Sequence, residues 1–219
     1  MSTAFPLLAL VAGYLIGSLS FAVIVSRTMR LDDPRTYGSR NPGATNVLRS
    51  GSKAAAVVTL ALDALKGVAA VVLVNWLAVR YGIVGDALDW SPGLAGLGAF
   101  LGHLWPVYFH FKGGKGVATA AGVLLGLNPW LGLATIATWL IIAAFFRYSS
   151  LASLVAAVFA PFYQLLIWGA GPETAIVTLM SLLLVWRHTA NISKLLAGKE
   201  SKLGQKAGGV IAPPRGARR

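Results

Sequence analysis

Stretches of about 20 mostly apolar residues recur along this chain, and they restrict the available folds more than any other feature. Residues 6–26 form the first stretch and residues 54–78 the second. A helix of this length crosses a hydrocarbon core roughly 30 Å thick. Because a helix satisfies its backbone hydrogen bonds within one segment, it is a stable structure in that medium. The sequence therefore predicts an all-α polytopic membrane protein.

The composition agrees with a membrane protein. Hydrophobic residues make up 56% of the 219 residues and charged residues only 12%, about half the usual share of a soluble domain. The mean hydropathy is +0.69. Cysteine is absent, which excludes disulfides and thiolate chemistry. Since no repeat or linker divides the chain, we expect one helical bundle over residues 1–193.

Seven segments are predicted to cross the membrane: 6–26, 54–78, 92–109, 117–127, 130–146, 151–167 and 174–186. The segment 117–127 is shorter than a spanning helix normally is. It is therefore either a thin crossing or a re-entrant helix. The bundle should contain about seven transmembrane helices.

The cations are distributed very unevenly between the two sides of this topology. Of the 19 Lys and Arg residues, all except Lys66 and Arg80 fall on one side. Cytoplasmic loops carry such an excess, so we expect the N-terminus outside and the C-terminus inside. The net charge of +12 then reflects topology and attraction to anionic lipid, with no nucleic-acid partner implied. Residues 194–219 are predicted to form a basic, disordered cytoplasmic tail.

A glycine and lysine turn, residues 111–117 (FKGGKGV), lies between two apolar runs. Gly113, Gly114 and Gly116 leave backbone N–H groups uncovered, Lys115 adds positive charge, and a following helix would point its positive dipole end at the turn. These features indicate an anion site. The alternative is a basic loop that only marks the cytoplasmic side. The spacing does not fit a nucleotide-binding P-loop, which needs glycine at position 109 and Ser or Thr at position 116.

The first inner loop, residues 37–49, is dense in small polar side chains and arginine. Arginine binds phosphate oxygens, while hydroxyl and amide groups bind sugar-like hydroxyls. The loop therefore suits a polyol phosphate. Its candidate substrate-binding residues are Ser39, Asn41, Asn46 and Arg49.

Two predicted spans carry ionisable residues. Asp63 and Lys66 are three residues apart and share a helix face, so they can pair. Ionisable groups inside a bilayer are usually functional, although an ion pair that only orients the helix explains them equally well. His103 is more often a packing hydrogen-bonder than a base. We treat these three residues as supporting candidates.

The remaining polar clusters also fall at inner ends of spans, with Ser153 in one and His188 and Asn191 in another. Together the clusters predict one cationic pocket that faces the cytoplasm and opens to lipid. Carboxylates are too few on this side for paired-acid hydrolysis or a Mg²⁺ or Ca²⁺ cage. Three scattered histidines are weak evidence for zinc. We expect no metal and no cofactor.

Several long motifs, in the same order, resemble the PlsY-type bacterial acyl-phosphate:glycerol-3-phosphate acyltransferases. Further segments at 147–153 and 187–191 match as well. The resemblance covers nearly the whole chain except the tail. The motifs that carry it are residues 38–53 (GSRNPGATNVLRSGSK), 63–67 (DALKG), 102–106 (GHLWP) and 111–119 (FKGGKGVAT).

This resemblance implies acyl transfer from a fatty acyl phosphate to the 1-hydroxyl of sn-glycerol 3-phosphate, the entry step of phospholipid synthesis, at the inner face of the bacterial cytoplasmic membrane. It implies small-molecule substrates and lipid, with no obligate protein partner. Arg40 departs from the family, which commonly has glycine there. The catalytic candidates are Lys115, His188 and Asn191; the substrate contacts are Ser39, Arg49 and Ser153, with the glycines at 113, 114 and 116 around a phosphate.

Two other functions fit a cationic inner pocket. A non-enzymatic carrier or binder of anionic lipid or polyol phosphate needs the same charges, and an acyltransferase that uses acyl-CoA differs only in its donor. The H-x-x-x-x-D pair of another glycerolipid acyltransferase family is absent.

Overall fold

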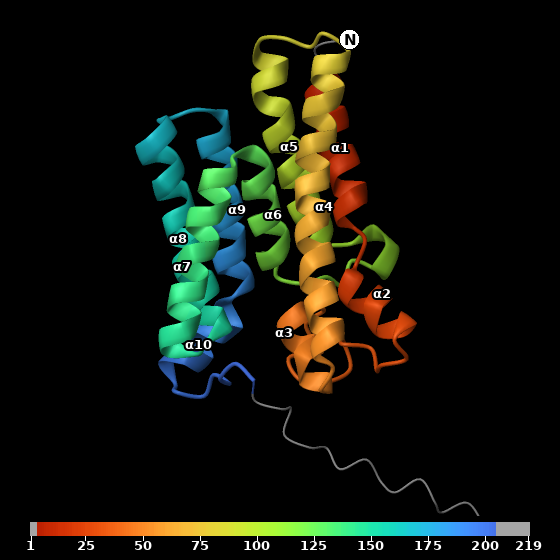
Figure 1. Cartoon of the computed structure of the whole chain (residues 1–219), viewed down its shortest axis with the longest axis vertical. Helices are drawn as coiled ribbons and strands as arrows, with labels where there is room; N and C mark the ends of the chain where they lie inside the picture. Colours follow the sequence, from red (N-terminus) through yellow and green to blue (C-terminus); the bar gives the residue numbers. More distant parts are fainter. Residues whose placement is uncertain (1–3, 205–219) are drawn as a thin grey trace, which may run out of the picture.

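The computed structural model describes residues 4–204, which form an all-helical bundle (Figure 1). The bundle has long helices that run roughly side by side, with short ones at their ends. In chain order the helices are α1 (Phe5–Gly17), α2 (Phe21–Thr28), α3 (Ala44–Val47), η2 (Leu48–Ser50), α4 (Lys53–Arg80), α5 (Asp86–Leu104), η3 (Val107–Phe109), α6 (Val117–Leu127), α7 (Pro129–Phe146), α8 (Ser149–Trp168), α9 (Pro172–Arg187) and α10 (Thr189–Leu196).

Within residues 4–204, four segments are long and apolar enough to cross a bilayer. They are α1 with α2, α4, α7 and α8. The pair α9 and α10, bent by 57° at His188, makes a fifth if it is one span. The prediction of an all-α membrane protein is thus confirmed, with four or five candidate spans.

Small residues let α1 and α5 pack backbone to backbone. A Cβ atom on Gly13 would overlap the carbonyl oxygen of Ala95, and one on Gly17 would overlap that of Ala99. Such spacing of small residues is typical of membrane helices, whose association depends on close packing rather than on hydrophobic burial. This contact holds the N-terminal helix against the helix that leads into the glycine and lysine turn.

Helices α4, α5, α6 and α9 share the main core. Phe100, Leu104 and Val123 are fully buried there. Large apolar side chains also cover the outside of the bundle: Phe145 is 81% exposed and Leu166 70%. An exposed apolar surface of this kind is suited to lipid rather than to water.

The helix α5 differs from its predicted span. The prediction placed the span at 92–109, whereas α5 begins at Asp86 and ends at Leu104. Asp86 and Asp89 lie in its first turn, where negative charge stabilises the helix dipole. Residues 105–116 are consequently all available to build the turn before α6.

The predicted tail is partly folded. Helix α10 continues to Leu196, and the Leu203 amide donates a hydrogen bond to the Arg147 carbonyl oxygen at 2.7 Å. Residues 199–204 therefore lie along the end of the bundle. Residues 205–219, the rest of the predicted tail, lie outside the described residues.

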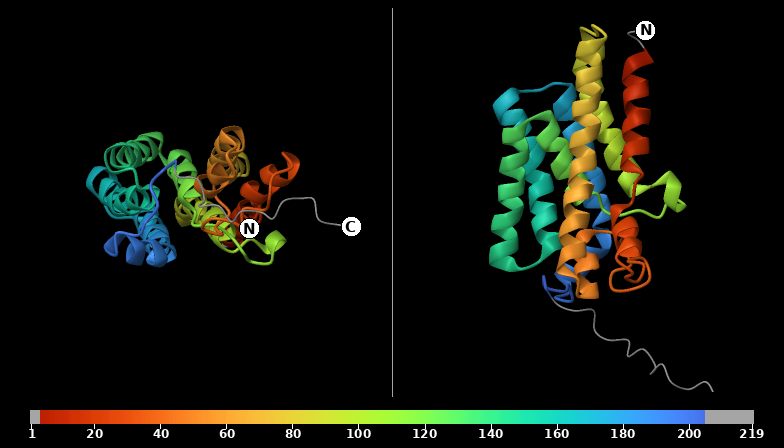
Figure 2. Two further views of the ribbon diagram at one scale, coloured as in Figure 1. Left: turned by 90° about the horizontal axis from the view of Figure 1, so that it is seen from below. Right: turned by 45° about the vertical axis from the view of Figure 1, so that its right-hand side comes forward.

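Most of the polar segments gather at one end of the molecule. Figure 1 shows α2, α3 and α10 at the lower end, opposite the N-terminus and the α4–α5 connection. In Figure 1 the lower end of α6, where this helix begins, lies above the lower ends of α4 and α7. The turn before α6 therefore lies further from the lower end of the bundle than the ends of α4 and α7 do. Viewed from below, the helices before α5 lie on one side of α5 and α6, and the helices after α6 lie on the other side (Figure 2).

Candidate active site

The glycine and lysine turn folds back on the end of α5. The Gly114 amide donates to the His103 carbonyl oxygen at 3.0 Å. A Cβ atom on Gly113 would overlap that carbonyl oxygen, and one on Gly114 would meet the His103 ring and the Pro42 carbonyl oxygen. Glycine is required at both positions because the neighbouring backbone and, at Gly114, the His103 ring leave no space for a side chain.

A second contact holds the turn from the C-terminal side. The Arg187 guanidinium donates to the Gly114 carbonyl oxygen at 3.0 Å and to that of Gly113 at 3.4 Å. Because these two carbonyl groups are bound to a cation, they do not repel an anion from the turn. Gly116 follows in the left-handed conformation, with φ of 84°, and α6 begins at the next residue.

Lys115 projects from this turn toward α10. Its Nζ atom donates to the Asn191 side-chain oxygen at 2.5 Å. The Asn191 amide nitrogen in turn donates to the Glu200 carboxylate at 2.8 Å. The Ser150 hydroxyl donates to the same carboxylate oxygen at 2.9 Å. One hydrogen-bonded chain therefore links four separate segments of the sequence.

Burial lowers the pKa of Lys115 from 10.5 to about 8. The Glu200 carboxylate raises that pKa, while the cations Lys194, Arg187 and Arg49 lower it. The ammonium group is therefore mostly protonated at pH 7 but held among other positive charges, an arrangement that favours binding of an anion.

His188 lies at the bend between α9 and α10 and is 2% exposed. Its Nδ1 atom is 2.8 Å from the Leu184 carbonyl oxygen. A carbonyl group only accepts hydrogen bonds, so Nδ1 carries the proton. The Nε2 atom is then left as the acceptor of the neutral ring, which suits it to orient a substrate hydroxyl.

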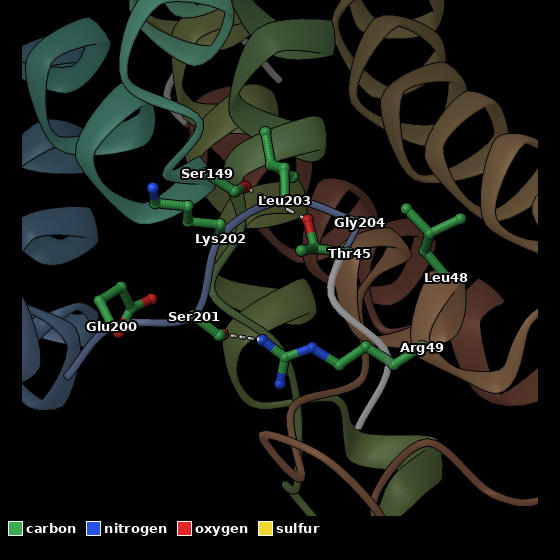
Figure 3. A pocket seen from close by; sticks show the side chains of 9 residues that line it. All are labelled: Thr45, Leu48, Arg49, Ser149, Glu200, Ser201, Lys202, Leu203 and Gly204. Atoms are coloured by element: carbon green, nitrogen blue, oxygen red, sulfur yellow. Dashed lines mark hydrogen bonds between the residues drawn. The ribbon is translucent and has the colours of Figure 1, made fainter. Parts of the chain in front are cut away.

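Arg49 reaches the site from the first inner loop. Its guanidinium donates to the Ser201 hydroxyl at 2.5 Å, and the Thr45 and Ser149 hydroxyls are 3.2 Å apart. Figure 3 shows this cavity between the first loop, the start of α8 and the C-terminal segment. It is lined by Thr45, Leu48, Arg49, Ser149, Glu200, Ser201, Lys202, Leu203 and Gly204.

The other sequence candidates in the first loop occupy different positions. Asn46 is 2% exposed; its amide donates to the Pro34 carbonyl oxygen at 2.7 Å, and its side-chain oxygen accepts from the Ser39 amide at 3.0 Å. Asn46 therefore shapes the loop. Ser39 is exposed on its rim and Asn41 is half-buried.

Ser153 is directed into the bundle. Its hydroxyl donates to the Ser149 carbonyl oxygen at 2.8 Å and accepts from the Trp139 indole at 3.1 Å. Ser150, one turn nearer the end of α8, is the hydroxyl that contacts Glu200. Ser153 thus secures α8 against α7 beneath the site.

Glu200 is the residue that sequence reasoning missed. The sequence places it in the predicted tail, residues 194–219, which has too little apolar content and too much charge to indicate a folded segment. Glu200 lies three residues before Leu203, in a segment with little apolar content. No helical or strand-like spacing of apolar residues there predicts that the segment packs against the bundle. Only the folded C-terminal segment places this carboxylate beside Asn191.

Arg40 has φ of 56°. That left-handed conformation is unfavourable for a residue with a side chain and favours glycine. The backbone therefore explains why glycine is common here in the family that the sequence resembles. Arg40 is exposed, so its side chain is accommodated at the rim.

These features define a helical membrane protein with a cluster of cationic and polar side chains at one end of the bundle. The family model described as glycerol-3-phosphate acyltransferase matches residues 7–198. The chain belongs to this family, which confirms the resemblance seen in the sequence.

Individual relatives agree. The glycerol-3-phosphate acyltransferase of Ralstonia nicotianae is 65% identical over 196 residues, which cover 90% of this chain and 93% of the relative. That of Burkholderia pseudomallei is 62% identical over 202 residues, covering 91% and 96%. The crystal structure of PlsY, an integral membrane glycerol 3-phosphate acyltransferase, in its glycerol 3-phosphate form has a TM-score of 0.80 at 36% identity, covering 91% and 96%. Its lysophosphatidic acid form has a TM-score of 0.79 at 35% identity, covering 91% and 95%.

Proposed function

We propose that this protein transfers a fatty acyl group from an acyl phosphate to the 1-hydroxyl of sn-glycerol 3-phosphate. The products are lysophosphatidate and inorganic phosphate. Family membership supports the acyltransferase activity, and the similar PlsY structures are a glycerol 3-phosphate form and a lysophosphatidic acid form. The acyl-phosphate donor rests on the sequence motifs.

The observation that carries the proposal is the convergence of Lys115, Asn191 and His188 beside a glycine turn. In the reaction, the hydroxyl oxygen attacks the acyl carbonyl carbon, and the bond from that carbon to the phosphate oxygen breaks. The phosphate leaves with the bonding electrons. Lys115 and the turn amides stabilise the negative charge that develops, while the site brings two anionic substrates together.

No covalent enzyme intermediate is needed, because an acyl phosphate is already activated. The Ser153 hydroxyl is not placed as a nucleophile: it donates to the Ser149 carbonyl oxygen within α8 and accepts from the Trp139 indole on α7, and neither partner is a base. We assign the proton of the attacking hydroxyl to a substrate phosphate, while His188 Nε2 accepts a hydrogen bond from the other hydroxyl of glycerol 3-phosphate and so orients that substrate. Arg49 and Ser39 would bind glycerol 3-phosphate from the first loop.

We also propose that seven segments cross the bacterial cytoplasmic membrane, with the N-terminus outside and the site facing the cytoplasm. The two additional crossings are α5 and the short α6. The charge distribution supports this orientation. Because the chain has no cysteine, Asp86→Cys and Lys199→Cys each introduce a single thiol. In intact cells, an impermeant maleimide should label only the first; labelling of the second alone would reverse the orientation.

A donor comparison tests the proposed reaction. Purified protein in detergent is given glycerol 3-phosphate with either acyl phosphate or acyl-CoA. We expect lysophosphatidate from acyl phosphate only. If lysophosphatidate formed only from acyl-CoA, acyl-CoA would be the donor in place of acyl phosphate. If both substrates bound but no product formed, the result would favour a non-enzymatic carrier.

A further inference from the structure

A buried polar cluster lies behind the glycine and lysine turn, formed by Asp63 and Lys66 on α4 and His103 on α5. Their exposed fractions are 2%, 3% and 7%. The Lys66 ammonium is 2.8 Å from the Asp63 carboxylate and 3.0 Å from His103 Nδ1. An ammonium group has only donors, so Nδ1 accepts, and the Nε2 edge of the ring carries the proton.

That Nε2 edge faces the turn. A Cβ atom built on Gly114 would overlap His103 Nε2, so the ring packs directly under the Gly114 backbone. The His103 carbonyl oxygen also accepts the Gly114 amide hydrogen bond at 3.0 Å. On the other side of the turn, the Thr119 hydroxyl in the first turn of α6 is 3.2 Å from His103 Nδ1. His103 therefore contacts the turn itself and the helix that follows it.

The cluster also connects the turn to the rest of the bundle. Lys66 donates to the Leu19 carbonyl oxygen at 2.7 Å, at the break between α1 and α2. A buried ion pair contributes little net stability, because removing both charges from water is costly. Its geometry, in contrast, fixes several segments at once. The contacts of Asp63, Lys66 and His103 lead to Gly114, which adjoins Lys115.

We propose that Asp63, Lys66 and His103 are positioning residues that set the orientation of the turn at residues 113–116, so that its amides and Lys115 meet a phosphate group. This inference deepens the proposed function and rests on its assignment of a phosphate to the turn. The three residues act through the backbone, and none of them touches the reacting atoms.

The test compares His103→Leu with Gln164→Leu in detergent. Gln164 is the matched control, since it is 3% exposed and its amide donates to Glu173 on α9 at 3.2 Å, near the opposite end of the bundle. Inorganic phosphate is titrated while the melting temperature is followed. We expect His103→Leu to weaken phosphate binding and to raise KM for glycerol 3-phosphate, each by about 10- to 100-fold, as for residues that orient a ligand group indirectly.

The control should lower the melting temperature without changing phosphate affinity. His103→Asn, which keeps a polar amide near Nδ1, should recover part of the affinity. Wild-type phosphate affinity in folded His103→Leu, or an equal loss in Gln164→Leu, would overturn the inference. If His103→Leu does not fold, the nearly isosteric Asp63→Asn takes its place, and an unchanged phosphate affinity there would count against the inference.

Phosphate titration requires no turnover, which separates the two proposals. If phosphate binding depends on His103 but no acyl transfer occurs, the proposed function fails and the positioning role stands. If wild-type protein transfers acyl groups while His103→Leu binds phosphate normally, the positioning role fails alone.

Discussion

Lys115 and Asn191 are 76 positions apart in the chain, and the Lys115 ammonium donates to the Asn191 side-chain oxygen at 2.5 Å. The contact joins the turn before α6 to the helix after the bend at His188. Since Asn191 also donates to Glu200, its amide orientation is fixed by an acceptor on one side and a donor on the other. The Lys115 position thus depends on three segments that sequence alone leaves unconnected.

Replacing Lys115 by glutamine should remove turnover without unfolding the protein. The amide lacks the charge that stabilises a developing oxyanion, so we expect a loss of about 10²- to 10³-fold in kcat. Initial rates of lysophosphatidate formation and the melting temperature measure the two effects separately. Near wild-type rates would remove Lys115 from the mechanism.

The Lys115 pKa of about 8 predicts an alkaline limit to activity. As pH rises through that value the ammonium loses its proton, and the site loses the charge that attracts phosphate. The pH profile of kcat/KM, which reports the free enzyme, should fall above about pH 8. In Lys115→Arg the charge persists, so any remaining activity should not fall there. If kcat/KM of Lys115→Arg still fell above the same pH as in the wild type, the alkaline fall would not be due to Lys115.

Glu200→Gln tests the carboxylate behind Asn191. Because the Glu200 charge raises the pKa of Lys115, its removal should move the alkaline limb below pH 8. It should also weaken the hold on Asn191 and lower kcat/KM. Glu173→Gln, near the opposite end of α9, is the control and should leave the limb in place. If both variants have the wild-type profile, Glu200 does not influence Lys115.

Gly114→Ala should disturb the turn. A Cβ atom there would lie 2.8 Å from the Pro42 carbonyl oxygen and overlap the His103 ring. Displacement of a binding group by about 1 Å can reduce the rate by about 10²-fold, so we expect kcat/KM for glycerol 3-phosphate to fall by up to about that factor. Gly171→Ala, where a Cβ atom meets nothing within 4 Å, should behave as wild type. Equal kinetics for the two variants would show that the turn tolerates a side chain.

His188→Ala separates orientation from proton transfer. If His188 orients glycerol 3-phosphate through a hydroxyl, KM should rise by about 2- to 10-fold, because a hydrogen bond between two neutral groups contributes about 0.5 to 1.5 kcal/mol. Steady-state kinetics with each substrate varied provide the measurement. A loss confined to kcat would assign His188 as the general base and contradict our assignment.

The membrane class could be predicted from residues 6–26 and 54–78, because long apolar runs allow few other folds. The turn around Lys115 could also be predicted, since glycine and lysine have local effects that need no tertiary contact. Asn46 and Ser153 were harder to interpret: a polar side chain near a site can bind a ligand or hold the backbone, and only hydrogen-bond partners distinguish these roles. Glu200 required the folded C-terminal segment itself.

The central claim is that one anion-binding site, built around Lys115, holds acyl phosphate and glycerol 3-phosphate together. The acyl group is transferred there from the first substrate to the second. The most direct measurement is simultaneous quantification of lysophosphatidate and inorganic phosphate formed by the purified protein from acyl phosphate and glycerol 3-phosphate. We predict that the two products appear in equal amounts with wild-type protein and that neither exceeds background with Lys115→Gln. Phosphate release without lysophosphatidate, or no release from folded wild-type protein, would contradict the account.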